Sequence, residues 1–196
     1  MSPNLSGNVS KGLLFILSAP AGTGKTTLVQ LLTRDSPNVV ASVSYTTRKP
    51  RPGEIEGIHY NFIDKDEFNH RIQAGDFLEH VELYDNFYGT SKAWVESKLC
   101  QGKHVILVID TQGAELVKQK TQVISIFVAP PSLDELEKRL RLRRTESDEM
   151  IEKRLKWSKR EIEVQKKYNY LIINDDLSSA YQALRSILIA EEHRVR

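Results

Sequence analysis

The chain is poor in the features that mark secreted, membrane-spanning and nucleic-acid-binding proteins. Its 196 residues include one cysteine, Cys100, so an intramolecular disulfide is excluded. No apolar stretch approaches the ~20 residues of a membrane span. Lysine and arginine number 28 against 26 acidic residues, without the basic excess of proteins that bind nucleic acid or membranes. We therefore expect a cytoplasmic protein that binds neither, with Cys100 filling packing space near a helix end.

The N-terminal region resembles a signal peptide in one respect. Lys11 precedes the apolar sequence GLLFILSAPA, which contains an Ala-x-Ala pattern. The strongly apolar part is shorter than the usual signal-peptide core, and it runs directly into a glycine-rich loop. A buried strand is the better interpretation. Residues 1–10 are predicted to be a loose tail, and the remaining length suits one core with a small appended lobe.

Short apolar segments alternate with amphipathic ones, the pattern of an α/β fold with a mostly parallel sheet. Strands are predicted at residues 13–18, 39–43, 77–83, 104–109, 123–129 and 170–173. Helices are predicted at residues 25–33, 64–74, 92–101 and 177–192, and a charged helical stretch at 133–168. Two prolines and two glycines in KPRPGEIEG make residues 49–57 a loop. Ser132 is predicted to cap the helix that follows it.

The sequence APAGTGKTT, residues 19–27, fits the phosphate-binding loop (P-loop) of nucleotide-binding proteins, with alanine at the first glycine position. Glycines let backbone N–H groups turn toward an anion at a helix N-terminus. Lys25 would reach the β- and γ-phosphates, and the Thr26 hydroxyl would ligate Mg²⁺. A mere strand–helix turn is the alternative, but the loop has the strand and helix neighbours that the motif requires. The expected nucleotide-binding residues are Ala19, Pro20, Ala21, Gly22, Thr23, Gly24, Lys25, Thr26 and Thr27.

A second basic segment, SVSYTTRKPRPGE, spans residues 42–54. Arg48 and Arg51 have Pro50 between them, so a stiff backbone presents two guanidinium groups, which favour bidentate contact with phosphate oxygens. Taken alone, such a loop is more often plain exposed surface. Tyr60 and Tyr88 offer further hydroxyl groups, the latter in the glycine turn FYGT. The pattern favours a second phosphate site without establishing one.

Together with the P-loop, the segments SVSYTTRKPRPGEIEGIHYNF, FLEHVELYDNFYGT, VIDTQG and LIINDD closely resemble the guanylate kinase family. The resemblance covers about residues 11–190, in the family's motif order. It implies phosphoryl transfer from ATP to GMP, and also to dGMP, with Mg²⁺ as cofactor and the nucleotides as partners. It also implies a P-loop NTPase-type parallel sheet with helices on both faces, a GMP-binding lobe over about residues 44–95 and a helical lid over about residues 139–160.

The same resemblance assigns roles to individual residues. Those expected to bind GMP are Ser44, Arg48, Arg51, Tyr60, Glu79, Tyr88, Thr90 and Asp110. Among them, Ser44 and Glu79 would read the guanine, and the arginines and tyrosines would hold the phosphate. Those expected at ATP, besides the P-loop, are Arg139 in the lid and Asn174 at the adenine edge. The expected catalytic set is Lys25, Arg48, Arg143 and Arg154.

Guanine chemistry supports the Glu79 assignment independently. Guanine presents N1–H and N2–H donors side by side, and one carboxylate accepts both. Adenine has no N1–H and would leave the carboxylate unpaired, and sites built in this way discriminate by roughly 10⁴-fold. From the strand pattern alone, an ordinary polar residue on the outer face of a sheet is the better interpretation of Glu79.

Asp110 ends the apolar run HVILVID, where a carboxylate at the C-terminal edge of a central strand faces ligands. A structural cap of the next helix is the alternative. Relatives often carry another acid two residues earlier, where this chain has Val108. Residues two apart share a strand face, so Val108 removes a carboxylate beside Asp110. We therefore expect Mg²⁺ to rely on Thr26, phosphate oxygens and waters.

The segment KRLRLRRTESDEMIEKRL, residues 138–155, is rich in arginine. Thr145 with Asp148 resembles a capping box, which predicts that one helix ends near Arg144 and another begins. The resemblance places Arg139, Arg143 and Arg154 over the phosphates, where cations neutralise the transferring group. A solvated helix with ion pairs such as Glu149–Lys153 is the alternative, and we favour it for Arg141 and Arg144.

Two other function classes fit part of the sequence. A nucleotide-binding interaction module without catalysis is expected to lose P-loop or lid groups. This chain keeps Lys25, Thr26, Arg143 and Arg154, and Val108 alone favours that class. A hydrolysing P-loop switch or motor needs a water-positioning residue and switch loops, and it leaves the acceptor-side residues unexplained. Stimulation of ATP turnover by GMP separates a kinase from both. The sequence leaves the oligomeric state open.

Overall fold

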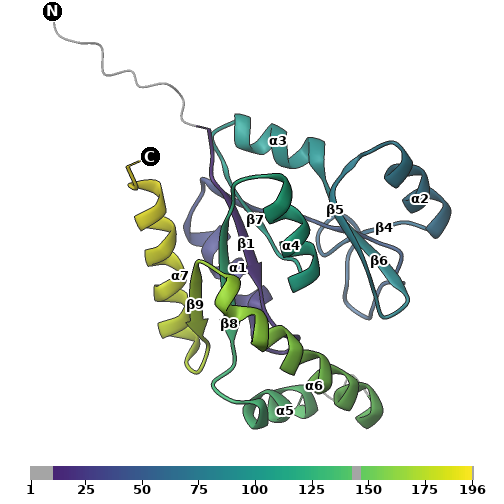
Figure 1. Ribbon diagram of the computed structural model, residues 1–196, viewed down its shortest axis with the longest axis vertical. Coiled ribbons are helices and arrows are strands. Elements are labelled where there is room, and N and C mark those ends of the chain that lie inside the picture. The colour runs from purple at the N-terminus through teal and green to yellow at the C-terminus, as the bar shows by residue number, and fades with distance from the viewer. Residues whose placement is uncertain (1–10, 143–146, 196) are drawn as a thin grey trace, which may run out of the picture.

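Five parallel strands form the centre of the molecule (Figure 1). The computed structural model describes residues 11–142 and 147–195. The strand order across the sheet is β2 (Val39–Ala41), β7 (His104–Leu107), β1 (Leu14–Ser18), β8 (Ile124–Ala129) and β9 (Tyr170–Ile173). All neighbouring pairs in this sheet are parallel. Parallel neighbours need crossover connections, which explains why apolar and amphipathic segments alternate along the chain.

Helices cover both faces of this sheet, as the sequence predicts. α1 (Lys25–Asp35) and α7 (Leu177–Glu192) pack on one face, where Leu28 and Leu184 join the core cluster around Phe15. α3 (Lys92–Cys100) and α4 (Thr111–Lys120) pack on the other through a second cluster. Because both faces are covered, β1 is buried along its whole length.

A second sheet lies to one side of the core (right in Figure 1) and forms, with α2 (Lys65–Gln73), what we call the small lobe. Its strand order is β4 (Asn61–Phe62), β3 (Tyr45–Thr46), β6 (Asn86–Ser91) and β5 (Phe77–Leu83). β6 pairs antiparallel with both β3 and β5. Phe68 of α2 packs against Phe77 and Phe87, with ring centroids 4.6 and 5.5 Å apart. These rings give the small lobe a core of its own.

α5 (Leu133–Leu142) and α6 (Asp148–Glu163) form a helical hairpin in the lower part of Figure 1, and the 3₁₀ helix η1 (Val164–Lys167) leads from it to β9. The Ser132 hydroxyl accepts from the Glu135 N–H at 3.1 Å, which confirms it as the cap of α5. Ser147 caps α6 by accepting from the Met150 N–H. The predicted break between two helices is confirmed, because α5 ends at Leu142 and α6 begins at Asp148. The predicted capping residue is wrong, since the N-cap is Ser147, which is followed by acids that favour a first helical turn. Thr145 itself lies outside the described residues.

Three further local predictions need correction. Cys100 ends α3 but is exposed, so it does not fill packing space. β2 ends at Ala41 and β7 at Leu107, each two residues earlier than predicted. After β7 the chain turns to place Asp110 as the N-cap of α4, which is incompatible with a continued strand. No helix among the described residues combines the length and apolarity needed to cross a membrane.

Candidate functional site

The P-loop lies between the end of β1 and the start of α1. Gly22 and Gly24 have φ angles of 98° and 87°, a backbone conformation that favours glycine. Within residues 11–142, no side chain caps the first turn of α1 and that turn contains no acidic residue. The backbone N–H groups there are left for an anion, and the positive end of the helix dipole is unopposed.

Lys25 and Thr26 begin α1. The Lys25 ammonium donates to the Ala19 carbonyl at 3.0 Å, so the side chain folds back along the loop. Burial lowers the pKa of Lys25, and the carboxylates of Glu161 and Asp110 oppose that shift. Thr26 is exposed at the helix start, as is Thr27. The loop therefore presents a cation together with N–H and hydroxyl donors, as phosphates require.

Asn174, just after β9, supports the P-loop. Its amide donates to the Thr23 carbonyl at 2.6 Å, and only 4% of the residue is exposed. A Cβ at Gly24 would lie 2.6 Å from the same amide nitrogen, so this close approach also needs glycine. Arg139 of α5 donates to the Asn174 carbonyl at 2.8 Å and pairs with Glu135 at 3.1 Å. The observed contacts are with the loop, and the adenine contact of Asn174 stays a prediction.

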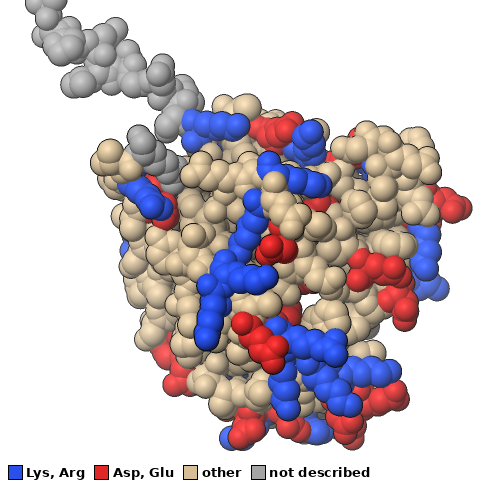
Figure 2. Space-filling view, in the orientation of Figure 1, with Lys and Arg blue, Asp and Glu red and all other residues tan. Residues whose placement is uncertain are grey.

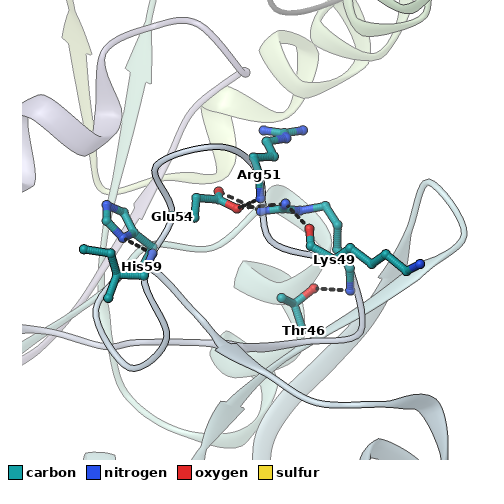
Figure 3. Close-up of polar contacts among 7 residues, drawn as sticks. Thr46, Lys49, Arg51, Glu54 and His59 are labelled. Atoms are coloured by element: carbon teal, nitrogen blue, oxygen red, sulfur yellow. Dashed lines mark hydrogen bonds and ion pairs between the residues drawn. The ribbon is translucent and has the colours of Figure 1, made fainter.

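Figure 3 shows the loop between β3 and β4, where the second phosphate site is expected. The Arg48 guanidinium donates to both oxygens of Glu54, at 2.8 and 2.9 Å. Glu54 also accepts from the backbone N–H of Arg51 at 2.7 Å, and the Thr46 hydroxyl accepts from that of Arg48 at 3.2 Å. Burial alone would raise the pKa of Glu54, but the hydrogen bonds from Arg48 and Arg51 lower it. An ionised carboxylate therefore orients the Arg48 fork.

Tyr60 and Tyr88 join Arg48. The guanidinium carbon lies 5.3 Å from the Tyr60 ring centroid, and the two tyrosine rings are 6.0 Å apart. Burial raises the pKa of Tyr60, and Tyr88 adds to the shift, so the Tyr60 hydroxyl remains a donor. The Arg51 side chain is exposed on the same loop. The structure thus groups the residues that the sequence assigns to a phosphate.

Glu79 and Thr90 form a buried polar pair in the β5–β6 hairpin. The Thr90 hydroxyl donates to Glu79 Oε1 at 2.6 Å, and the two residues are 2% and 1% exposed. Burial raises the pKa of Glu79 to about 7; the Thr90 bond opposes this shift and the Asp110 carboxylate adds to it. Oε2 remains for a further donor. The outer-face alternative for Glu79 is wrong, because the side chain points inward toward α4.

The two carboxylate oxygens of Asp110 differ in their hydrogen bonding. Oδ1 accepts from the Gly113 N–H at 2.9 Å, so Asp110 is the N-cap of α4. Oδ2 is buried, and it has no hydrogen-bond partner among the described residues. Burial raises the pKa of this carboxyl, while backbone N–H groups of α4 oppose the shift. The structural alternative is confirmed, and it leaves one oxygen for a ligand.

Two other residues singled out in the sequence, Ser44 and Val108, also have defined surroundings. Ser44 is 8% exposed, and its carbonyl accepts from the Asn61 N–H at 2.9 Å. Val108 packs against the core cluster around Phe15. The prediction that Val108 and Asp110 share a strand face is wrong, because β7 ends before both.

Oxygen donors at the P-loop are few. Among residues 11–142 and 147–195, no group of three or more His, Cys, Asp or Glu side chains is arranged to hold a metal ion. The Thr26 hydroxyl is exposed beside Lys25. Mg²⁺ prefers oxygen ligands and keeps several waters, so this hydroxyl fits an ion that arrives bound to a nucleotide.

Of the arginines expected in the lid, Arg139 lies on α5 and Arg154 on α6. Figure 2 shows an opening between the hairpin and the small lobe. Tyr84, at the tip of the β5–β6 hairpin, contacts Trp157 of α6, with ring centroids 6.1 Å apart. Arg154 is half-buried on α6. Arg143 and Arg144 lie outside the described residues.

Ion pairs join other charged residues on the surface of the hairpin. Arg141 pairs with Glu137 at 2.7 Å and with Asp148 at 2.6 Å, and Lys153 pairs with Glu149 at 3.0 Å. The solvated role favoured for Arg141 is therefore confirmed.

Three residues at the site carry no role in the sequence interpretation: Glu54, Gly113 and Glu161. The sequence contains a feature that could have indicated the role of Glu54: this acid follows Arg51 by three residues in a rigid loop. Gly113 is part of the quoted VIDTQG motif, but its tight contact with Glu79 is visible only in three dimensions. Glu161 lies in a charged helix whose sequence gives no sign that this acid is buried.

Comparison with known proteins identifies the family. The family model described as guanylate kinase matches residues 11–191. The chain is 60% identical over 191 residues to a guanylate kinase of Protochlamydia amoebophila, covering 97% of each chain. It is 49% identical over 183 residues to a guanylate kinase of Chlamydia trachomatis, covering 93% of this chain and 89% of the other. A crystal structure of guanylate kinase from Anaplasma phagocytophilum matches with a TM-score of 0.79 and 36% identity, covering 95% and 89%. The chain therefore belongs to the guanylate kinase family.

Proposed function

We propose that the protein holds Mg·ATP at the P-loop and GMP or dGMP at the small lobe, and passes the γ-phosphoryl group directly from one to the other. As a guanylate kinase, it phosphorylates GMP at the expense of ATP. The proposal adds the metal, the deoxynucleotide and the residues that do the work. It also assigns the GMP-binding lobe to about residues 44–95 and the lid to about residues 139–160.

The buried Glu79 carboxylate carries this proposal. Its Oε1 is oriented by Thr90, and the ionised group accepts the N1–H and N2–H of guanine. Asp110 Oδ2, buried and without a partner in the described structure, is the second acceptor at the base, and Ser44 contributes its hydroxyl. Adenine, cytosine and uracil do not present this pair of adjacent donors, so the site selects guanine.

Direct transfer needs positioning and charge neutralisation more than covalent chemistry. Arg48, Arg51, Tyr60 and Tyr88 hold the GMP phosphate, whose oxygen attacks the γ-phosphorus while the bond to ADP breaks. Lys25 and the P-loop N–H groups hold the donor phosphates. The Thr26 hydroxyl holds Mg²⁺ with phosphate oxygens and waters, and the bound ion neutralises phosphate charge.

The lid supplies the remaining cations: Arg139, Arg143 and Arg154. Closure of the lid and the lobe excludes water, which otherwise competes with GMP for the phosphoryl group. The contact between Tyr84 and Trp157 supports a joint closure of the lid and the small lobe, because it connects the small lobe to α6.

A product assay tests the proposal. Purified protein with ATP and Mg²⁺ is incubated separately with GMP, dGMP, AMP, CMP and UMP, and the nucleoside diphosphates are resolved. We expect GDP and dGDP, little other diphosphate, no release of free phosphate and no turnover when a chelator removes the metal. Turnover of AMP at the rate of GMP would contradict the Glu79 assignment, and ATP hydrolysis without GMP would contradict direct transfer.

Gly113→Ala is expected to impair GMP binding selectively. The new Cβ would lie 2.8 Å from Glu79 Oε2 and 3.2 Å from Asp110 Oδ1, so the Glu79 side chain must move. A displaced carboxylate loses a well-aligned hydrogen bond to guanine, and a hydrogen bond to a charged group contributes about 1–3 kcal/mol. We therefore expect KM for GMP to rise by about 10- to 100-fold. KM for ATP should not change.

Gln112→Ala is the matched control, because it adds no atom near Glu79 and the Gln112 side chain is exposed on the same turn.

Thermal unfolding of Gly113→Ala provides a check on the fold. Alanine has a higher helix propensity than glycine, so this variant should show no general loss of stability. An equal rise of both Michaelis constants would indicate a distorted fold rather than the displacement of Glu79.

A further inference from the structure

The tip of the β5–β6 hairpin has an unusual backbone conformation. The ladder ends with Leu83 opposite Asn86, so Tyr84 and Asp85 form a two-residue turn. Their φ angles are 50° and 62°, and among residues 11–142 and 147–195 no other residue except glycine has a positive φ. Such turns favour Asn-Gly, because a bulky side chain in this region of φ is crowded by the backbone. The turn itself therefore gives no reason for a tyrosine.

Packing inside the small lobe gives no reason for Tyr84 either, because the residue is 45% exposed. Its ring packs instead on Trp157 of α6, with centroids 6.1 Å apart and ring planes inclined by 56°. Tilted rings at this distance attract one another. The Asn86 amide donates to the Tyr84 carbonyl at 2.7 Å and so supports the backbone that aims the ring. The tyrosine therefore serves a contact outside its own lobe.

This contact joins the two parts of the molecule that border the opening in Figure 2. On one side, the β5–β6 hairpin carries Glu79 before the turn and Tyr88 after it, and both are assigned to GMP above. On the other side, Arg154 lies three residues before Trp157 in α6, so the two side chains are neighbours on the helix surface. The ring contact therefore connects the strands that hold GMP to the helix that carries a lid arginine.

We propose that Tyr84 and Trp157 are a pair of positioning residues. Their contact sets the orientation of α6 relative to the β5–β6 hairpin, so that Arg154 faces the phosphate of the nucleotide that the hairpin holds, a role that rests on the proposed function. The less favourable turn is retained because asparagine or glycine at Tyr84 would have no ring to offer α6.

Tyr84→Asn separates the turn from the contact, because asparagine suits a positive φ but has no ring. We expect the transfer step to slow by about 2- to 10-fold, the factor that an aromatic contact supplies. Single-turnover kinetics with saturating ATP, GMP and Mg²⁺ measure this step. The Kd of GMP and the Kd of a non-hydrolysable ATP analogue, each measured alone, should not change, because the proposed nucleotide contacts are all retained. The melting temperature should match or exceed that of the wild type.

Variants of the partner ring test whether the two residues act as a pair. Trp157→Leu keeps an apolar side chain on α6 without the ring, and it should slow transfer by a similar factor. Trp157→Phe keeps a ring and should restore most of the rate. The double variant of Tyr84→Asn and Trp157→Leu should be no slower than either single variant, because each removes the same contact. Asp85→Asn is the matched control: it changes an exposed residue of the same turn, keeps both rings and should transfer at the wild-type rate.

A wild-type transfer rate in Tyr84→Asn would overturn the proposal, and so would additive effects of Tyr84→Asn and Trp157→Leu. A lower melting temperature that accompanies the lower rate would show that Tyr84 has a structural role only.

The Arg154→Ala background separates the ring contact from the proposed function. There, Tyr84→Asn should cause no further loss of rate, because the pair acts through Arg154, and a further loss would contradict the pairing with Arg154. If Arg154→Ala transfers at the wild-type rate, the assignment of Arg154 fails, and the role of the two rings fails with it. If Arg154→Ala slows transfer and Tyr84→Asn does not, only the role of the two rings is wrong.

Discussion

Arg154→Ala is expected to lower kcat by about 10³-fold, the lower end of what an arginine contributes to phosphoryl transfer. The reason is that the transferring group spreads negative charge over its oxygens in the transition state, and Arg154 on the α5–α6 hairpin is proposed to face that charge. Because Arg154 is proposed to meet this distribution of charge only in the transition state, the Kd of ATP should change far less than kcat. Single-turnover kinetics with saturating ATP and GMP measure the transfer step directly.

Arg160→Ala is the matched control, since it removes the same side chain from the same helix at an exposed position. It should leave the transfer rate close to that of the wild type. Arg154→Lys keeps the charge but loses the planar fork, and we expect a rate between those of the wild type and the alanine variant. An unaltered transfer step in Arg154→Ala would remove this residue from the catalytic set.

Glu79→Gln is expected to lower kcat/KM for GMP by about 100-fold while sparing the affinity for ATP. A bidentate contact with a base is worth about 1–3 kcal/mol of discrimination. In Glu79→Gln, the amide NH₂ group would face an N–H group of guanine, and two donors cannot form a hydrogen bond with each other. Thr90 still finds an acceptor at the amide oxygen, so the local fold is preserved. Steady-state titration of each nucleotide at saturating concentrations of the other measures the two effects separately. An unchanged KM for GMP would exclude Glu79 from guanine recognition.

The pH profile adds an independent check on Glu79. The pKa of its carboxyl is about 7 because the group is buried, and only the ionised form accepts both guanine donors. In the wild type, kcat/KM for GMP should therefore fall as pH drops through about 7. Glu79→Gln should lack this step, and the ionisation of GMP itself, common to both proteins, cancels in the comparison.

As pH rises, the folding stability of the wild type should fall, whereas its kcat/KM for GMP should rise. The pKa of Glu79 is higher in the folded protein than in the unfolded chain, so above the unfolded value the unfolded state binds fewer protons. Folding stability is then lost as pH rises from about 4.5 to 7, because a buried charge must form. Glu79→Gln avoids that charge, and its free energy of unfolding should match or exceed that of the wild type above pH 7. Such a result would separate loss of function from loss of structure.

Much of the fold follows from local sequence pattern. The strand at Tyr170–Ile173 and the helix at Leu177–Glu192 have the predicted bounds, because apolar periodicity and flanking acids define both without long-range help. The P-loop is equally local: Gly22 and Gly24 allow its turn, and the helix that follows supplies the N–H groups. The prediction of the capping residue failed at the start of α6, where two nearby hydroxyl residues could each cap the helix and Ser147 does so.

The chemistry of the candidate site depends on tertiary contacts. Arg48, Tyr60 and Tyr88 come from separate segments; residue chemistry favoured their association at a phosphate, but only the resemblance to a family assigned them to GMP. The inward orientation of Glu79 requires Thr90 across the hairpin and the space left by Gly113 on α4. No local pattern marks Glu161, since an acid on a charged helix looks the same whether it is solvated or buried.

The sequence by itself determined the α/β architecture, the nucleotide-binding loop and the family, because these are written in periodicity, glycine placement and contiguous motifs. The tertiary structure decided the charge environment: which carboxylates are buried, which oxygen of Asp110 remains for a ligand, and which acid faces Lys25. The physical reason is that burial and Coulomb interactions depend on distances between residues far apart in the chain. The pKa values and hydrogen bonds that govern recognition and transfer are therefore properties of the folded molecule.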